Sequence, residues 1–72
     1  MTRSEAMALV SKLEDRARHG GRNEGIEGKL YVKFSMNGRH PLYYWREDGW
    51  QGQHHSAGTK LPWNDVVLRL AP

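Results

Sequence analysis

The side chains best suited to chemistry are three histidines and two carboxylates in the second half of the chain. His40, His54 and His55 could ligate a metal ion, and Glu47 and Asp48 could add oxygen ligands. A structural zinc site needs four ligands that converge on one point. His54 and His55 are neighbours in a predicted strand, so their side chains should point to opposite faces, and the chain has no cysteine. We interpret the histidines as surface residues and predict no metal and no other cofactor.

Nucleophilic catalysis has no matching pattern. It needs a serine, threonine or cysteine beside an oriented base, and the serines are scattered over a predicted helix, a strand and a loop. The glycine-rich stretch HGGRNEGIEG lacks the Lys-Ser/Thr end of a phosphate-binding loop. A chain of 72 residues also offers little room for a water-excluding pocket. We predict that the protein is not an enzyme. The serines are Ser4, Ser11, Ser35 and Ser56.

Aromatic and basic side chains are concentrated in RHPLYYWREDGWQG, residues 39–52. Tyrosine and arginine are enriched at protein interfaces and their hot spots, and aromatic residues on a basic sheet also stack single-stranded bases. A hydrophobic core needs aromatic residues as well. The elements that carry this stretch therefore decide which side chains a partner could reach.

A first helix is predicted over residues 3–18. Thr2 and Glu5 match a capping box. Gly20 or Gly21 can adopt the left-handed backbone conformation that ends a helix. The glycine-rich segment 20–28 is predicted to be a linker. Apolar residues at helical spacing form one stripe: Ala6, Leu9, Val10, Leu13 and Ala17.

A hairpin is predicted next, with strands over 29–36 and 39–46. Asn37-Gly38 is typical of a two-residue type I′ turn, which pairs Met36 with Arg39 and so places Tyr31 opposite Tyr44. Alternation along the strands separates two faces. The core face carries Leu30, Val32, Phe34, Tyr43 and Trp45, and the opposite face carries Tyr31, Lys33, Ser35, His40, Leu42, Tyr44 and Arg46.

A third strand is predicted over residues 50–55. If Asp48-Gly49 is a type I′ turn, Trp50 joins the core face. A three-residue loop would reverse the parity and turn Gln51 and Gln53 inward. We favour the first register, because burying a tryptophan is favourable whereas burying two unpaired amides is costly. Pro41 lacks an N–H, so its nitrogen must face away from a partner strand.

The last element is predicted to be a helix over residues 62–70. Trp63, Val66, Val67 and Leu70 have helical spacing, and Pro62 suits the first helical turn. A strand that alternates through Val66, Leu68 and Leu70 is the alternative. Trp45 and Trp63 are both predicted to be core residues. The predicted fold is one small α+β domain, residues 1–72, in the order α-β-β-β-α, with both helices on one face of a three-stranded antiparallel sheet.

Two short helices should leave the other face of the sheet open. That face is the candidate partner-binding surface. The alternatives are that its tyrosines only pack across strands and stabilise the sheet, or that the charged first helix is the interface. The candidate partner-binding residues are Tyr31, Lys33, His40, Leu42, Tyr44 and Arg46.

Charge and hydropathy narrow the class of protein. The net charge is +3, and the whole excess lies in residues 29–72, without a run of like charges. No apolar run is long enough for a membrane span or a signal peptide. The absence of cysteine fits a reducing compartment. We predict a cytoplasmic protein with no membrane partner.

The element order resembles that of double-stranded-RNA-binding domains. That family contacts phosphates with a lysine-rich start to its last helix, whereas this segment reads LPWND with Lys60 before it. The resemblance therefore implies the fold and not the RNA function. In size and lack of cysteine the chain resembles small accessory proteins of bacteriophages, including anti-CRISPR inhibitors, which implies action by contact with a larger protein.

Three hypotheses follow. The first is a non-enzymatic binding module that contacts a host or phage protein, for example as a phage-type inhibitor in the manner of an anti-defence protein. The second is a nucleic-acid-binding module that uses the same face. The third is a minor structural protein or homodimer. The first is favoured, because the basic excess is small and Glu47 and Asp48 at the sheet tip would repel phosphates.

Overall fold

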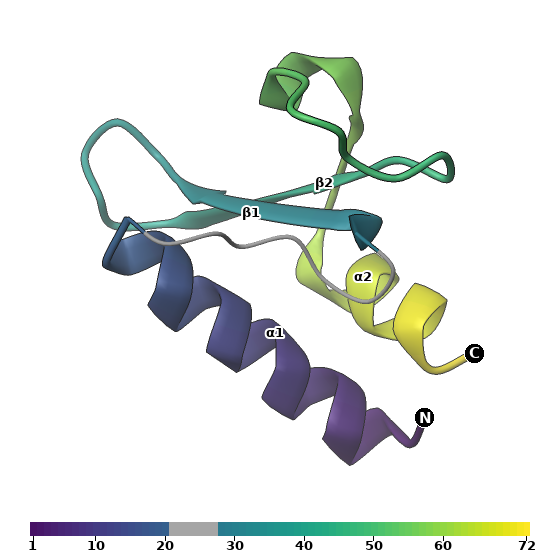
Figure 1. The fold of residues 1–72 in the computed structure, drawn as a ribbon. Helices are drawn as coiled ribbons and strands as arrows, with labels where there is room; N and C mark the ends of the chain where they lie inside the picture. The colour runs from purple at the N-terminus through teal and green to yellow at the C-terminus, as the bar shows by residue number, and fades with distance from the viewer. Residues whose placement is uncertain (21–27) are drawn as a thin grey trace.

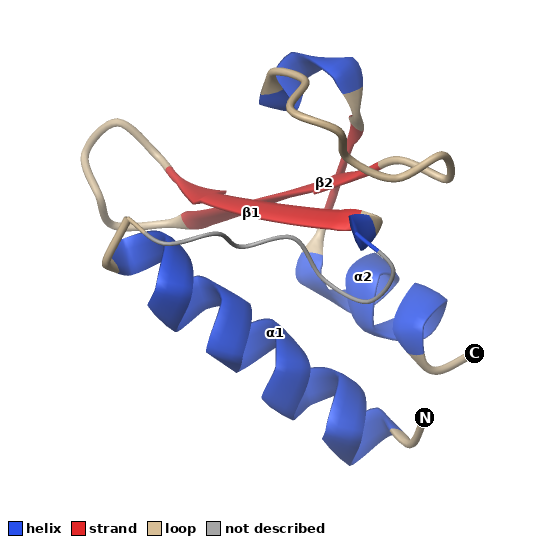
Figure 2. Cartoon of the chain, in the orientation of Figure 1, coloured by secondary structure: helices blue, strands red, loops and turns tan. Residues whose placement is uncertain are grey.

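The computed structural model describes residues 1–20 and 28–72 and confirms the predicted order α-β-β-β-α. One antiparallel sheet has the strand order β1-β2-β3. Both helices lie on one face of it, while the chain between β2 and β3 arches over the other (Figures 1 and 2). The elements are α1 (Arg3–Arg18), β1 (Leu30–Phe34), β2 (Pro41–Trp45), the 3₁₀ helix η2 (His55–Ala57), β3 (Thr59–Leu61) and α2 (Trp63–Leu70).

α1 begins and ends as predicted. The Glu5 N–H donates to the Thr2 hydroxyl at 3.1 Å, and the Thr2 N–H donates to the Glu5 carboxylate at 2.7 Å, which completes the capping box. These bonds with Thr2 lower the pKa of Glu5. Gly20 follows the helix in the left-handed region, with φ of 77°. The predicted linker over 20–28 falls mainly on residues 21–27, which lie outside the described residues.

The core lies between the two helices and the sheet face that they cover, here called the inner face. As predicted, the inner face carries the alternating apolar residues of β1 and β2. Phe34 is only partly buried, and the guanidinium of Arg18 lies 4.5 Å from its ring centre. The described part of the chain has no helix long and apolar enough to cross a membrane. The buried core residues are Ala6, Val10, Leu13, Leu30, Val32, Tyr43, Trp45, Val66 and Val67.

The hairpin has the predicted register but a different loop. Tyr31 pairs with Tyr44 and Leu30 with Trp45, as expected. The strands, however, are shorter than predicted, and the two-residue type I′ turn is wrong. The Ser35 N–H donates to the His40 carbonyl at 2.8 Å, and this bond closes a four-residue loop over 36–39. Lengthening the loop by one residue on each side leaves every strand pair unchanged.

Side chains rather than a tight turn hold this loop. The Asn37 side-chain oxygen accepts from the Ser35 hydroxyl at 2.5 Å and from the Arg39 N–H at 3.0 Å. The Gly38 N–H donates to the Ser35 carbonyl at 2.8 Å. Gly38 lies in the left-handed region with φ of 71°, and a Cβ at this position would meet no atom within 4 Å. Backbone conformation alone therefore requires the glycine.

We expect Gly38→Ala to lower the free energy of unfolding by about 1 kcal/mol, because a side chain in the left-handed region costs roughly 1–2 kcal/mol. Urea denaturation measures the loss. Met36→Ala, in the same loop, should change stability by less than about 0.5 kcal/mol. Gly38→Asn should recover part of the loss, since asparagine tolerates this conformation. Equal losses for the alanine and asparagine variants would contradict the backbone explanation.

The third strand is not where it was predicted. Residues 50–55 do not form it, and β3 is Thr59–Leu61, with Leu61 opposite Tyr43. Gly49 and Gly52 have φ of 82° and 87°, and such residues cannot continue an extended strand. The Trp50 N–H donates instead to the Gly28 carbonyl at 2.8 Å, just before β1. Residues 46–58, here called the excursion, therefore leave the sheet before the chain returns as β3.

α2 is helical, so the alternating strand considered for this segment is wrong. Pro62 is the N-cap, and the helix begins one residue later than predicted, at Trp63. Leu68 is 56% exposed, as a helix with one buried face requires. Trp63 is only partly buried, at the margin of the core and not inside it. The other residues of the predicted stripe that face the core are Val66, Val67 and Leu70.

Candidate binding surface

The face of the sheet turned away from the helices, here called the outer face, carries most of the predicted partner-binding residues. Tyr31 lies opposite Tyr44, and Lys33 lies opposite Leu42. These four side chains are all partly exposed. His40 is exposed but follows the 36–39 loop, outside the strands. The register therefore gathers four of the six predicted residues, and the excursion determines how accessible each one is.

Trp50 is buried as predicted, but on the outer face instead of the core face. It is 7% exposed, its ring centre lies 5.0 Å from that of Tyr31, and its indole N–H donates to the Lys29 carbonyl at 2.9 Å. A Cβ on Gly58 would lie 2.5 Å from the Trp50 ring. The indole thus packs tightly between β1 and the end of the excursion, and it covers part of Tyr31.

Arg46 fastens the excursion to the sheet. Its Nε–H donates to the Gly49 carbonyl at 3.0 Å, and one of its terminal nitrogens donates to the Ala57 carbonyl at 3.1 Å. The guanidinium carbon lies 5.8 Å from the centre of the Trp50 ring. The Arg46 guanidinium was predicted to contact a partner. Its donors are instead largely occupied by hydrogen bonds to the chain's own backbone.

The two adjacent histidines lie on the outer face with their rings together. The ring centres of His54 and His55 are 3.9 Å apart, and His55 lies 4.9 Å from Tyr44. The prediction that they point to opposite faces is wrong, because they enter η2 and not a strand. Partial burial, and then the nearby His54 and Lys33, lower the pKa of His55. Among the described residues, no group of three or more His, Cys, Asp or Glu side chains is arranged to hold a metal ion.

Lys60 is a surface residue that the sequence prediction missed. It pairs with Tyr44 across β2 and β3, which places it on the outer face near Leu42, with β2 between it and Lys33. It was considered only as the residue before the last helix, because the third strand was expected elsewhere. The run GTKLP could have indicated it, since Thr59 is β-branched and Pro62 ends the strand. The part of the outer face that stays at least partly exposed, here called its open part, is formed by Lys33, Leu42, Tyr44 and Lys60, with His55 of the excursion against one side of the Tyr44 ring.

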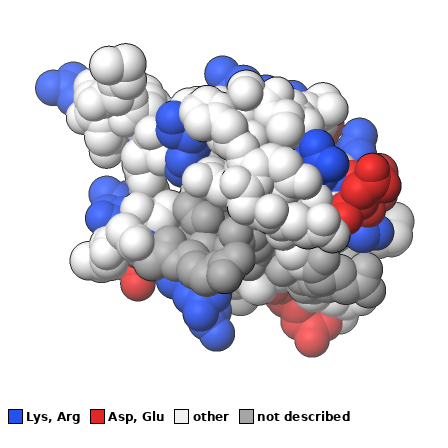
Figure 3. Space-filling model, turned by 45° about the horizontal axis from the view of Figure 1, so that its top comes forward, with Lys and Arg blue, Asp and Glu red and all other residues white. Residues whose placement is uncertain are grey.

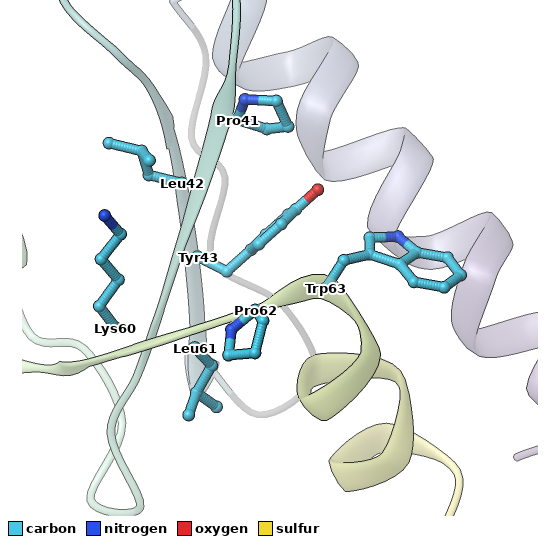
Figure 4. A pocket seen from close by; sticks show the side chains of 7 residues that line it. All are labelled: Pro41, Leu42, Tyr43, Lys60, Leu61, Pro62 and Trp63. Atoms are coloured by element: carbon cyan, nitrogen blue, oxygen red, sulfur yellow. The ribbon is translucent and has the colours of Figure 1, made fainter.

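An apolar pocket lies at the edge of the sheet, where β3 ends and α2 begins (Figure 4). Its volume is about 410 Å³. It forms because pairing between β2 and β3 ends at Tyr43 and Leu61, so Pro41 has no residue of β3 opposite it. The missing N–H of Pro41 is tolerated there, as predicted. The lining residues are Pro41, Leu42, Tyr43, Lys60, Leu61, Pro62 and Trp63.

The floor of this pocket offers little polar chemistry. The Tyr43 hydroxyl donates to the Glu14 carboxylate of α1, so it is already engaged. Burial, together with this bond, raises the pKa of Tyr43 well above its ordinary value, and the phenol stays protonated. Figure 4 shows the Tyr43 and Trp63 rings on one side of β2, with Leu42 and Lys60 on the other. The pocket thus wraps around the sheet edge, from an apolar floor to a cationic rim.

One of the two acidic side chains at the sheet tip, Glu47, is bonded to residues of the core and of α2. The Glu47 carboxylate accepts from the Trp45 indole at 2.8 Å and from Arg69 of α2 at 3.1 Å, and Lys29 lies 3.7 Å away. It is therefore held on the helix side and largely neutralised. Figure 3 shows basic side chains over most of this face of the molecule, with acidic ones at its right-hand edge and along its lower side. The expectation that Glu47 and Asp48 would repel a phosphate therefore weakens for Glu47, whereas for Asp48 it stays a prediction.

Comparison of the chain with protein-family models, with curated proteins and with solved structures finds no match. The functional argument therefore rests on the geometry of the outer face and its edge pocket.

Proposed function

We propose that the protein is a non-enzymatic binding module that contacts a partner protein through the open part of the outer face. The observation that carries this proposal is the continuity between that face and the apolar pocket: Leu42 and Lys60 belong to both. An apolar concavity bordered by a tyrosine and cations combines the residue types that provide most of the binding energy at protein interfaces. The finer hypothesis, a phage-type inhibitor of a larger host protein, stays a prediction.

The structure changes which residues should matter. Tyr44 offers a large, rigid contact at low entropic cost, and Lys33 and Lys60 offer cations. Arg46 should instead act by holding the excursion in place. Arg46→Ala is therefore expected to weaken both binding and stability, whereas a residue of an open binding surface would affect binding alone.

We expect Tyr44→Ala to weaken partner binding by about thirtyfold, as truncation of a hot-spot residue costs about 2 kcal/mol. The full chain captures its partner from a host lysate treated with nuclease, and titration of the purified partner with folded variants measures the affinity. Lys12→Ala and Arg16→Ala on α1 serve as controls and should change the affinity less than threefold, or about 0.6 kcal/mol. Loss of binding in the α1 variants, with Tyr44→Ala unaffected, would place the interface on α1.

Binding of a single-stranded nucleic acid is the second candidate, and the position of Glu47 favours it. With that carboxylate paired to Arg69 and Lys29, the outer face presents Tyr44, His55 and two lysines. Aromatic stacking with nearby cations suits a flexible strand. A nucleic-acid complex should weaken steeply as salt is raised, whereas a protein complex that depends on apolar contacts should not. Loss of the captured partner on nuclease treatment would favour this candidate.

A further inference from the structure

The edge pocket has the features of a site for one bulky side chain. Two prolines, Pro41 and Pro62, form rigid walls, and partly buried Leu61 and Trp63 pack against the core beneath it. A site that is already formed does not lose further conformational entropy when it is filled. Its volume of about 410 Å³ lies near the lower end of ligand sites, roughly 300–1,000 Å³. A cavity of roughly 150 Å³ already holds a benzene ring, so the pocket has room for one aromatic or large aliphatic group together with the backbone that carries it.

The rim supplies a charge preference. Lys60 belongs to the pocket lining, and Lys33 belongs to the neighbouring row of the outer face. Neither lysine forms an ion pair with a carboxylate within residues 1–20 and 28–72. The Glu14 carboxylate accepts a hydrogen bond from the Tyr43 hydroxyl on the helix side and pairs with neither lysine. A ligand with a negative group at the rim would therefore meet cations that are not neutralised.

We propose that the pocket binds a segment of a partner protein in which a bulky apolar side chain adjoins a carboxylate. The apolar group occupies the space between Pro41 and Pro62, over the Tyr43 ring, and the carboxylate meets Lys60. This proposal rests on the proposed function and makes it more specific, because it names the chemistry that the partner must present.

The test uses the full chain, labelled with ¹⁵N, and a blocked tetrapeptide of the order glycine, phenylalanine, aspartate, glycine. Saturable chemical-shift changes are expected at the backbone amides of the non-proline lining residues, with an affinity on the order of 1 mM. These residues are Leu42, Tyr43, Lys60, Leu61 and Trp63. Replacing the phenylalanine of the probe by alanine should weaken binding at least about tenfold, because the apolar burial is lost. Replacing its aspartate by asparagine should weaken binding about twofold to fivefold at low salt, since the ion pair is partly exposed.

A charge exchange gives the sharpest control. Lys60→Glu should weaken binding of the aspartate peptide and strengthen binding of a peptide with lysine in its place. Lys12→Glu, an equal change of charge on the exposed surface of α1, should do neither. Both residues are exposed, so both variants should fold. A Lys60→Glu variant that binds both peptides as the wild type does would overturn the role of this lysine.

The remaining outcomes are also decisive. Shifts that map elsewhere, or that do not saturate, would overturn the pocket as the site. Shifts at those same lining amides that follow the concentration of the protein alone would show that a second copy of the chain fills the pocket. Tyr44→Ala distinguishes this proposal from the broader one. If that variant loses the captured partner while the peptides show no dependence on phenylalanine or aspartate, the protein-contact function holds and the pocket proposal fails.

Discussion

Trp45→Ala should leave much of the chain unfolded at 25 °C. Trp45 is 8% exposed at the centre of the core, its indole N–H donates to Glu47 at 2.8 Å, and Arg69 lies 5.6 Å from its ring centre. Removal of a buried tryptophan typically costs about 3–5 kcal/mol, and a core of this size supplies roughly that much net stability. Far-UV circular dichroism during urea and thermal denaturation would measure the loss.

Trp63→Ala is the matched control. Both tryptophans were predicted to be core residues, but Trp63 is only partly buried. Its removal should leave a smaller cavity, so the loss in free energy of unfolding should be clearly smaller than for Trp45→Ala. Equal losses would mean that Trp63 contributes to the core as fully as Trp45. A melting temperature for Trp45→Ala within a few degrees of the wild type would contradict the core assignment.

Trp50→Ala should lower the free energy of unfolding by about 3 kcal/mol. The region that opens first should differ from that in Trp45→Ala. Trp50 packs on the outer face against Tyr31 and Gly58, and its indole N–H satisfies the Lys29 carbonyl. It is not part of the core cluster between sheet and helices. Local opening should therefore affect the excursion first. Native-state hydrogen exchange should show faster exchange over residues 49–58, with α1 still protected.

A double-mutant cycle with Gly58→Ala tests the same contact. In the wild type, the added Cβ would lie 2.5 Å from the Trp50 ring and 3.2 Å from the Trp45 carbonyl oxygen. Overpacking of this kind typically costs about 1–3 kcal/mol. In the Trp50→Ala background the ring is absent, so most of this cost should disappear. Additive losses in the double variant would show that Trp50 and Gly58 are not in contact.

The fold could be predicted where one local pattern decided it. The capping box, the helical stripes and the alternation around Tyr31 and Tyr44 each require only neighbouring residues, and all were correct. The hairpin register was confirmed although the turn type was wrong, because the four-residue loop takes one residue from each side of the predicted turn. The prediction of the third strand was wrong because the Trp50 side chain could be buried in either of two places. Sequence reasoning considered only the core, whereas the actual site forms from distant parts of the chain at Gly28, Lys29 and Gly58.

The candidate surface was predicted in part for the same reason. Lys33, Leu42 and Tyr44 follow from strand parity, which local sequence determines. The engagement of Arg46 depends on the path of the excursion, and Lys60 enters the surface only through pairing of β3 with β2. The edge pocket likewise requires knowing where β3 ends. Features that need long-range pairing could not be derived from local pattern.

The exposed tip of the β1–β2 hairpin also offers a practical means of observing this protein. Met36 is 105% exposed relative to a reference side chain and lies outside the core, the outer face and the edge pocket. The chain contains no cysteine, so Met36→Cys would introduce a single thiol. A fluorophore attached there would report on binding at the outer face from the end of the hairpin, without occupying the surface that it monitors.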